Sequence, residues 1–164
     1  MEQVAENKLK IGKNLVHLFD ESVTKEDAIK TLAAHLHDQG YVKESFSSAV
    51  LEREKIYPTG LPTLPVGVAI PHTDTEHVIS SALAVGILSN PVTFQEMGSL
   101  DANVDVHIIS MMAISNPKSV MPVLRNLALA YQDHEFLAML KNSSSQDMIL
   151  DLYKNRIPDV IEIV

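Results

Sequence analysis

The chain has 164 residues, a formal net charge of -8 at pH 7 and no cysteine. The length fits a single domain. Without cysteine the chain cannot form disulfides, use a thiol in catalysis or bind zinc through cysteine. The negative net charge argues against nucleic-acid binding, which needs a basic face. No apolar run approaches the roughly 20 residues of a membrane span, and residues 1–6 lack the pattern of a signal peptide. We therefore expect a cytoplasmic protein without direct membrane insertion, and a flexible N-terminus over residues 1–10.

The segment before residue 57 predicts one strand and two helices. Residues 15–19 alternate as a strand does. Thr24 can cap a helix that ends at Gly40, and the apolar residues of this helix recur at spacings of three and four, which predicts one buried stripe. Residues 41–54 predict a second helix, and Arg53 lies close to its end.

The run from Gly67 to Thr73 predicts an imidazole presented at the end of a strand. Val68 to Ile70 are apolar, which is typical of a buried strand, and Pro71 then removes a backbone donor, so the chain leaves the sheet there. His72 follows at the strand's end, where we expect an exposed ring. A neutral imidazole, which titrates near about pH 6.5, keeps a lone pair that can attack phosphorus. His72 is therefore a candidate nucleophile.

The rest of the chain alternates strands and helices. We expect strands at 81–88 and 104–113 with a short extended piece at 91–94, and helices at 118–130, 134–141 and 145–153. The apolar tail, residues 156–164, either adds an edge strand or contacts a second subunit. These elements predict an α/β fold, a single-domain sandwich with a mixed central β-sheet flanked by helices, and residues 11–155 form the predicted domain.

Two motifs together resemble a known family. The first is Glu52-Arg53-Glu54 followed by Pro58-Thr59-Gly60, and the second is Ala69-Ile70-Pro71-His72. Over roughly residues 16–153 the chain resembles the fructose/mannitol-type (type 2) enzyme IIA domain of the bacterial sugar phosphotransferase system.

This resemblance implies the mannitol/fructose-type IIA fold and a phosphohistidine relay without a cofactor or metal. His72 would accept phosphate from the phosphocarrier HPr and pass it to a cysteine of a IIB partner, while the membrane component IIC binds the sugar. Arg53 matches the family's active-site arginine. The guanidinium fork suits the charge on a transferring phosphoryl group better than a lysine does.

Two further residues are candidate helpers of the phosphoryl transfer. The mannitol branch of the family carries a second histidine in the segment after the last strand, and here the corresponding residue is Ser119. Galactitol-like members have a histidine five residues after the first, as His77 stands here. The resemblance therefore favours the galactitol-like subtype.

Two alternatives to a sugar-uptake phosphocarrier remain open. One is a regulatory, nitrogen-type relative that takes phosphate on the same histidine and signals by binding other proteins. The other is a metal site at His72 and His77, although their spacing matches neither a helical pair nor a zinc-protease motif. His107 lies in an apolar strand, and the sequence leaves its face undecided. The other histidines, His17, His35, His37 and His134, are expected on solvated surfaces.

Overall fold

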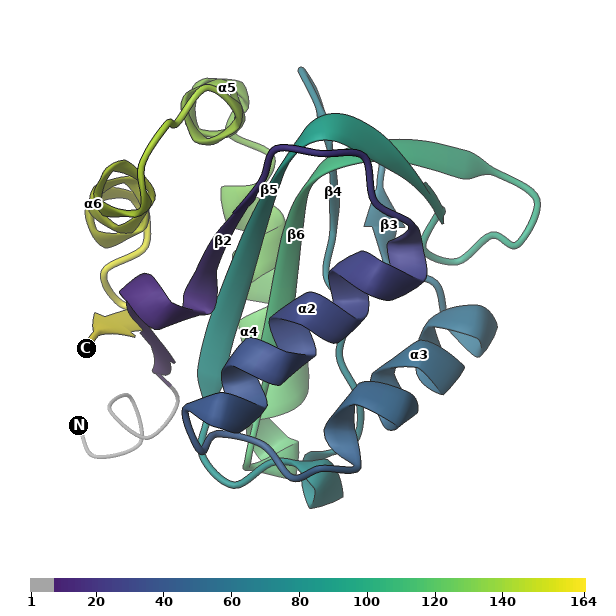
Figure 1. Ribbon diagram of the computed structural model, residues 1–164, viewed down its shortest axis with the longest axis vertical. Coiled ribbons are helices and arrows are strands. Elements are labelled where there is room, and N and C mark those ends of the chain that lie inside the picture. Colours follow the sequence, from purple (N-terminus) through teal and green to yellow (C-terminus); the bar gives the residue numbers. More distant parts are fainter. Residues whose placement is uncertain (1–7) are drawn as a thin grey trace.

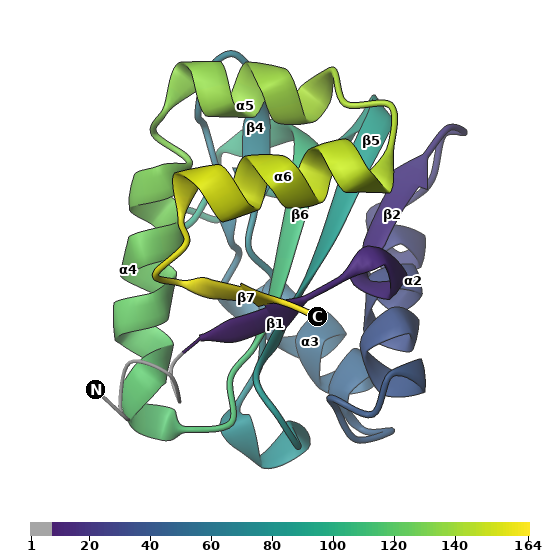
Figure 2. The same ribbon diagram turned by 90° about the vertical axis from the view of Figure 1, so that its left-hand side faces the viewer.

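The computed structural model describes residues 8–164, and within this range a mixed sheet is covered by helices on both faces (Figures 1 and 2). The strands are β1 (Leu9–Ile11), β2 (Val16–Phe19), β3 (Gly60–Leu61), β4 (Gly67–Ala69), β5 (Ala82–Gln95), β6 (Asn103–Ala113) and β7 (Ile161–Ile163). The α-helices are α2 (Lys25–Asp38), α3 (Phe46–Ile56), α4 (Val120–Ala130), α5 (His134–Lys141) and α6 (Gln146–Arg156). Short 3-10 turns are η1 (Lys13–Leu15), η2 (Thr75–His77) and η3 (Pro117–Ser119). The predicted α/β sandwich with a mixed central sheet is confirmed.

The sheet is organised around the long antiparallel pair β5 and β6. Its strand order is β3-β4-β6-β5-β1-β7, and β2 also pairs with β5. Strand β4 runs parallel to β6, whereas β1 and β2 run parallel to β5. Because β4 and β6 are parallel neighbours, the segments that follow them leave the sheet at the same edge.

Each face of the sheet carries its own apolar core. Helices α2 and α3 cover one face, where Ile29, Leu32 and Phe46 pack against residues of β5 and β6. Helices α4, α5 and α6 cover the other face, where Tyr131 and Tyr153 are fully buried. Burial of both faces explains why the central strands are almost continuously apolar.

The helix α2 begins as its sequence predicts, but α3 begins later. The Thr24 side chain accepts a hydrogen bond from the backbone N–H of Asp27 at 3.1 Å, which caps α2. Residues 41–45, expected to be helical, instead pair with the chain before β5: Val42 forms a bridge with Val78, and the carbonyl of Tyr41 accepts from Ile79 N. Their backbone groups are used by this pairing, so α3 starts only at Phe46.

The two extended pieces expected at 81–88 and 91–94 form one strand, β5. Its pairing with β6 shifts register between Ile87 and Val92, and this irregularity accommodates Pro91, which lacks a backbone donor. The strand therefore continues past a residue that ordinarily ends one.

The two ends of the domain differ from the sequence-based boundaries. Residues 1–7 of the expected flexible segment lie outside the described residues, whereas Leu9 and Lys10 are in β1, which pairs with β7. Of the two options for the tail, the structure has the edge strand, because β7 continues the sheet. The side chains of Leu9 and Ile161 are buried in one core, which holds both ends in the domain. In the described part of the chain, no helix combines the length and apolar character needed to cross a membrane.

Candidate functional site

His72 lies just after β4, at the edge where β4 and β6 end. The backbone N–H of Met112 in β6 donates to the carbonyl of Pro71 at 3.3 Å, which fixes the chain at this point. The expectation of an exposed ring is wrong, since only 8% of His72 is accessible. The turn at Pro71 keeps the ring against the sheet edge instead of projecting it into solvent.

One nitrogen of the His72 ring is occupied and the other is available. Nδ1 lies 2.8 Å from the carbonyl oxygen of Ile70, and because a carbonyl only accepts, Nδ1 carries the proton. In the neutral ring Nε2 therefore holds the lone pair. Among residues 8–164, the fully buried side-chain nitrogens without a partner are Arg53 Nε and His107 Nδ1, and Nε2 of His72 is not one of them.

The surroundings of His72 favour its neutral form. Burial is the largest cause that lowers the pKa of His72 below its ordinary value, and the nearby positive charge of Arg53 lowers it further. The hydrogen bond to Ile70 and the charge of Asp74 act in the opposite direction. The net lowering leaves the ring uncharged at neutral pH, as a nucleophile requires.

Arg53 lies in the last turn of α3 and reaches the loop that follows His72. Its Nη1 is 3.6 Å from Oδ1 of Asp74, and its guanidinium carbon lies 5.0 Å from the centre of the Tyr57 ring. Its Nε is buried and has no hydrogen-bond partner among the described residues. A buried donor without an acceptor is costly, and an anion beside His72 would satisfy it. Neither Asp74 nor Tyr57 was singled out from sequence, although both flank the two motifs.

A second pair that sequence reasoning missed connects the two motifs. Glu54 is buried, and its carboxylate accepts hydrogen bonds from both the backbone N–H and the hydroxyl of Thr59. The Thr59 hydroxyl oxygen also accepts from the backbone N–H of Ile70 at 3.1 Å. Both residues belong to the motifs quoted above, and that is the signal that could have identified them.

His77 does not face Arg53. Its Nδ1 lies 2.8 Å from the hydroxyl of Ser45, which precedes α3, and its Nε2 is 3.8 Å from Glu76. Ser45 and Arg53 are eight positions apart, or roughly 12 Å along the helix axis at about 1.5 Å per residue. The ring of His77 is therefore held at the opposite end of α3 from the Arg53 backbone.

Ser119 lies at the same sheet edge as His72. It ends η3, immediately before α4, in the segment that follows β6, and it is buried. Because β4 and β6 are parallel, the segments that carry His72 and Ser119 leave the sheet side by side. The topology therefore brings the segment that carries Ser119 to the sheet edge that also carries His72.

The other histidines do not support a metal centre. No group of three or more histidine, aspartate or glutamate side chains in residues 8–164 could hold a metal ion. Contrary to expectation, His17 and His35 are partly buried, with Nδ1 of the first 2.9 Å from Nε2 of the second. His107 is partly buried in β6. Burial and the charge of Lys141 lower the pKa of His107, and the charge of Asp105 raises it.

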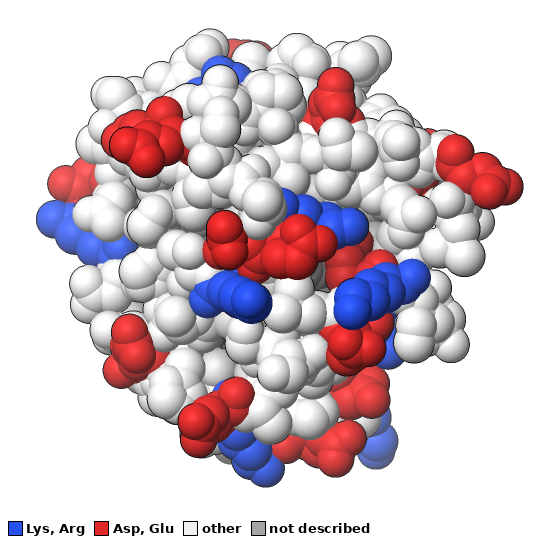
Figure 3. Space-filling model, turned by 45° about the vertical axis from the view of Figure 1, so that its right-hand side comes forward, with Lys and Arg blue, Asp and Glu red and all other residues white. Residues whose placement is uncertain are grey.

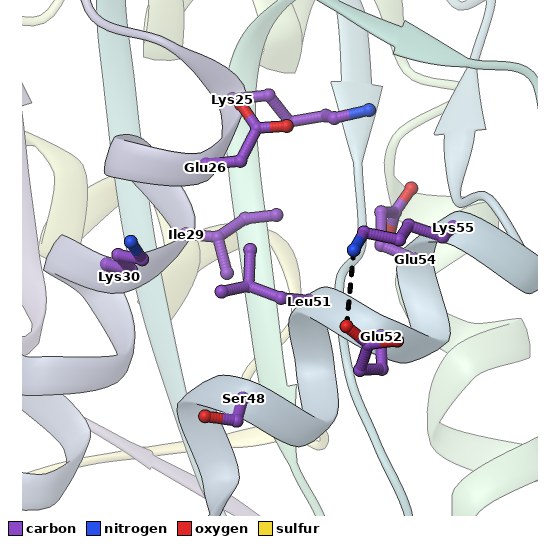
Figure 4. A pocket seen from close by; sticks show the side chains of 9 residues that line it. All are labelled: Lys25, Glu26, Ile29, Lys30, Ser48, Leu51, Glu52, Glu54 and Lys55. Carbon is purple, nitrogen blue, oxygen red and sulfur yellow. Dashed lines mark hydrogen bonds and ion pairs between the residues drawn. The ribbon is translucent and has the colours of Figure 1, made fainter.

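Charges are mixed on the face of the molecule that carries α2 and α3. Figure 3 shows lysines and arginines interspersed with acidic residues, without an extended basic patch on this face. Between α2 and α3 lies a cavity of about 190 Å³, whose lining includes Lys25, Lys55, Glu52 and Glu54 (Figure 4). Lys55 pairs with Glu52 across its rim at 3.2 Å.

Comparisons with known proteins agree on one family. The model of "Phosphoenolpyruvate-dependent sugar phosphotransferase system, EIIA 2" matches residues 10–156. The mannitol-specific EIICBA component of Escherichia coli (strain K12) is 28% identical over 153 residues, 92% of this chain and 23% of that protein. The galactitol-specific EIIA component of the same strain is 28% identical over 105 residues, 64% of this chain and 69% of that one. The chain thus spans about a quarter of the mannitol-specific relative.

A solved structure extends the similarity to the fold. The complex of enzyme IIAMTL and phosphorylated enzyme IIBMTL from Escherichia coli contains a chain that matches with a TM-score of 0.72 and 25% identity. The match covers 90% of this chain and 99% of that chain.

Proposed function

The chain belongs to the EIIA 2 family of the phosphoenolpyruvate-dependent sugar phosphotransferase system, and we propose that it is a cytoplasmic phosphocarrier whose reactive atom is Nε2 of His72. The observation that carries this proposal is the hydrogen bond from Nδ1 of His72 to the carbonyl of Ile70. That bond leaves the lone pair on Nε2, beside an arginine with an unsatisfied donor.

The transfer itself is an exchange of one bond to phosphorus for another. The lone pair of Nε2 attacks the phosphorus atom of phosphorylated HPr, and the P–N bond to HPr breaks, with its electron pair returning to the donor's imidazole. The His72 ring becomes positively charged while it holds the phosphoryl group, and the Ile70 carbonyl stabilises this charge through Nδ1–H. In the second step a thiolate of the IIB partner attacks phosphorus, and the His72 ring leaves as neutral imidazole.

Arg53 supplies electrostatic stabilisation in both steps. A transferring phosphoryl group spreads negative charge over its three equatorial oxygens, and catalysis depends mostly on positioning and on opposite charge. The guanidinium is held by Asp74 and by the Tyr57 ring, and its Nε remains without a partner in the described part of the chain. Arg53 therefore presents donors to the phosphoryl oxygens without having to break an existing Nε hydrogen bond.

The proposed partners rest on similarity to a solved IIA–IIB complex, and the proposed sugar type rests on Ser119 and His77. A related IIA chain has been solved with a phosphorylated IIB, and this supports a IIB acceptor for this chain too. HPr is the proposed donor, and IIC is reached only through IIB. Ser119 and His77 favour a galactitol-type system, and this choice rests on these two residues, because the galactitol-specific and the mannitol-specific relatives are both 28% identical to the chain. Ser119 and His77 act at most as helpers.

The experiment is labelling by phosphorylated HPr, followed by mass mapping of the modified residue. We expect label on His72 of the unaltered protein, no label on His72→Ala, and label on His77→Ala, which removes an imidazole from the same loop. Equal labelling of the two variants would remove His72 from its role. Chasing the labelled protein with galactitol-type and mannitol-type IIB proteins then tests the subtype, and a failure to label either IIB would favour the regulatory alternative.

A further inference from the structure

A buried carboxylate lies one residue beyond Arg53, in the last turn of α3. Glu54 is 4% exposed, and its two oxygens accept from the backbone N–H of Thr59 at 2.8 Å and from its hydroxyl at 2.9 Å. Burial raises the pKa of Glu54, whereas the two bonds from Thr59 and the charge of Lys25 lower it. Burying a carboxylate costs free energy unless its oxygens are hydrogen-bonded. The burial of Glu54 therefore depends on the two hydrogen bonds that Thr59 donates.

Thr59 connects that carboxylate to the backbone that precedes His72. A threonine hydroxyl has one proton, which it donates to Glu54, so its lone pairs are free to accept. One of them accepts the backbone N–H of Ile70 at 3.1 Å. Ile70 is fully buried and lies one residue beyond the end of β4, so this N–H has no solvent to bind if the hydroxyl is removed.

The opposite end of the same residue sets the state of the nucleophile. The carbonyl of Ile70 accepts from Nδ1 of His72 at 2.8 Å. Hydrogen bonds thus connect the helix turn that carries Arg53, through Glu54 and Thr59, to the N–H of Ile70, and the carbonyl on the other side of the Ile70 Cα binds the ring of His72. Figure 4 shows Glu54 at the end of α3, on the wall of the cavity between α2 and α3.

We propose that Glu54 and Thr59 are positioning residues for phosphotransfer: they anchor the backbone of Ile70 at its N–H, so that the carbonyl on the other side of its Cα keeps the proton of His72 on Nδ1, and they fix the end of α3 that carries Arg53. This inference rests on the proposed function of His72. Without these bonds, the backbone at Ile70 is free to shift, its carbonyl no longer stays at Nδ1, and the ring is free to place its proton on Nε2. In that tautomer the reactive nitrogen has no lone pair with which to attack phosphorus.

The test compares Thr59→Val with Thr59→Ser. Valine keeps the branched shape without a hydroxyl, whereas serine keeps the hydroxyl. The first readout is the tautomer of His72 in the free protein, measured from nitrogen–proton couplings by NMR, which needs no phosphoryl donor. The second is the single-turnover rate of labelling by phosphorylated HPr. We expect Thr59→Val, which removes both hydrogen bonds of the hydroxyl, to show a mixture of tautomers and a rate about 10- to 100-fold lower. Thr59→Ser should restore both.

The outcomes separate this inference from the proposed function. If the unaltered protein takes no label, the proposed function fails, while the tautomer measurement still reports on these hydrogen bonds. If the unaltered protein is labelled and Thr59→Val keeps both its rate and its Nδ1–H tautomer, the positioning role is overturned and the phosphocarrier stands. A slow Thr59→Ser with an unchanged tautomer also overturns it, because the hydroxyl is present. Should Thr59→Val fail to fold, Glu54→Gln provides the same two readouts, and wild-type values there overturn the role.

Discussion

Replacing Arg53 by lysine tests whether the shape of the guanidinium, and not its charge alone, speeds the transfer to His72. Lysine keeps a positive charge at the end of α3, but it is a point charge that cannot present Nε and Nη donors together. The structure shows one donor, Nη1, directed to Asp74 and another, Nε, buried without a partner in residues 8–164. The substitution therefore removes at least one donor that is available to a phosphoryl oxygen.

The magnitude follows from the value of one charge-assisted hydrogen bond. Such a bond contributes about 1.5–3 kcal/mol, and each 1.36 kcal/mol of transition-state stabilisation changes a rate about tenfold. We therefore expect Arg53→Lys to be labelled by phosphorylated HPr about 10- to 150-fold more slowly, with the label still on His72. The assay is a single-turnover labelling time course at saturating donor.

Two further variants make the result interpretable. Arg156 in α6 donates from its Nε to Asp133 at 3.0 Å, and α6 packs on the sheet face opposite to α3. Arg156→Lys therefore makes the same chemical change and should leave the rate unaltered. Arg53→Met removes the charge as well, and because that charge lowers the pKa of His72, the pKa should rise in this variant but not in Arg53→Lys. A wild-type labelling rate for Arg53→Lys would refute the reasoning.

Two predictions concern pH and packing. Because the folded-state pKa of His72 is lowered, its ring resonances should titrate below about pH 6.5. Just below pH 6.5 the unfolded protein therefore binds more protons than the folded protein. The stability that His72 contributes is present above about pH 6.5 and is lost as the pH falls through the folded-state pKa. An NMR midpoint at or above 6.5 would contradict this. Gly67→Ala should destabilise the protein, since its Cβ would lie 2.5 Å from the carbonyl oxygen of Asp105 and 2.6 Å from Val104 Cγ1. Overpacking of this kind costs about 1–3 kcal/mol, a fall in melting temperature of about 2–12 °C for a chain of this size, and an unchanged melting temperature would show that β4 and β6 can separate.

The chemistry assigned to His72 depends on contacts that no motif specifies. The sequence pattern places an imidazole after a buried strand and a proline, but it suggested an exposed ring. The structure has a ring that is largely buried, with Nδ1 occupied by Ile70. Burial lowers the pKa, and the hydrogen bond selects the tautomer. Both effects favour the proposed attack by Nε2, because they leave this nitrogen with its lone pair at neutral pH.

The features of the fold and of the candidate site that were predictable are those carried by short sequence patterns. The cap at Thr24, the helix His134–Lys141 and the end of a strand before Pro71 were each predicted from a few adjacent residues, and the structure has all three. Capping, helical periodicity and proline geometry depend on residues that are close together in the sequence, so they can be predicted from it. The family resemblance, carried by two such patterns, was confirmed by the match over residues 10–156.

The sequence by itself therefore determined the α/β class, most of the helices and the identity of the candidate nucleophile. Only the tertiary structure decided that Arg53 meets Asp74, that His77 binds Ser45 at the other end of α3, and that Thr59 supports Ile70. These contacts join residues whose distance depends on strand pairing and on the packing of α3 against the sheet. Strand register and side-chain packing depend on the whole core, so they cannot be predicted from a short stretch of residues.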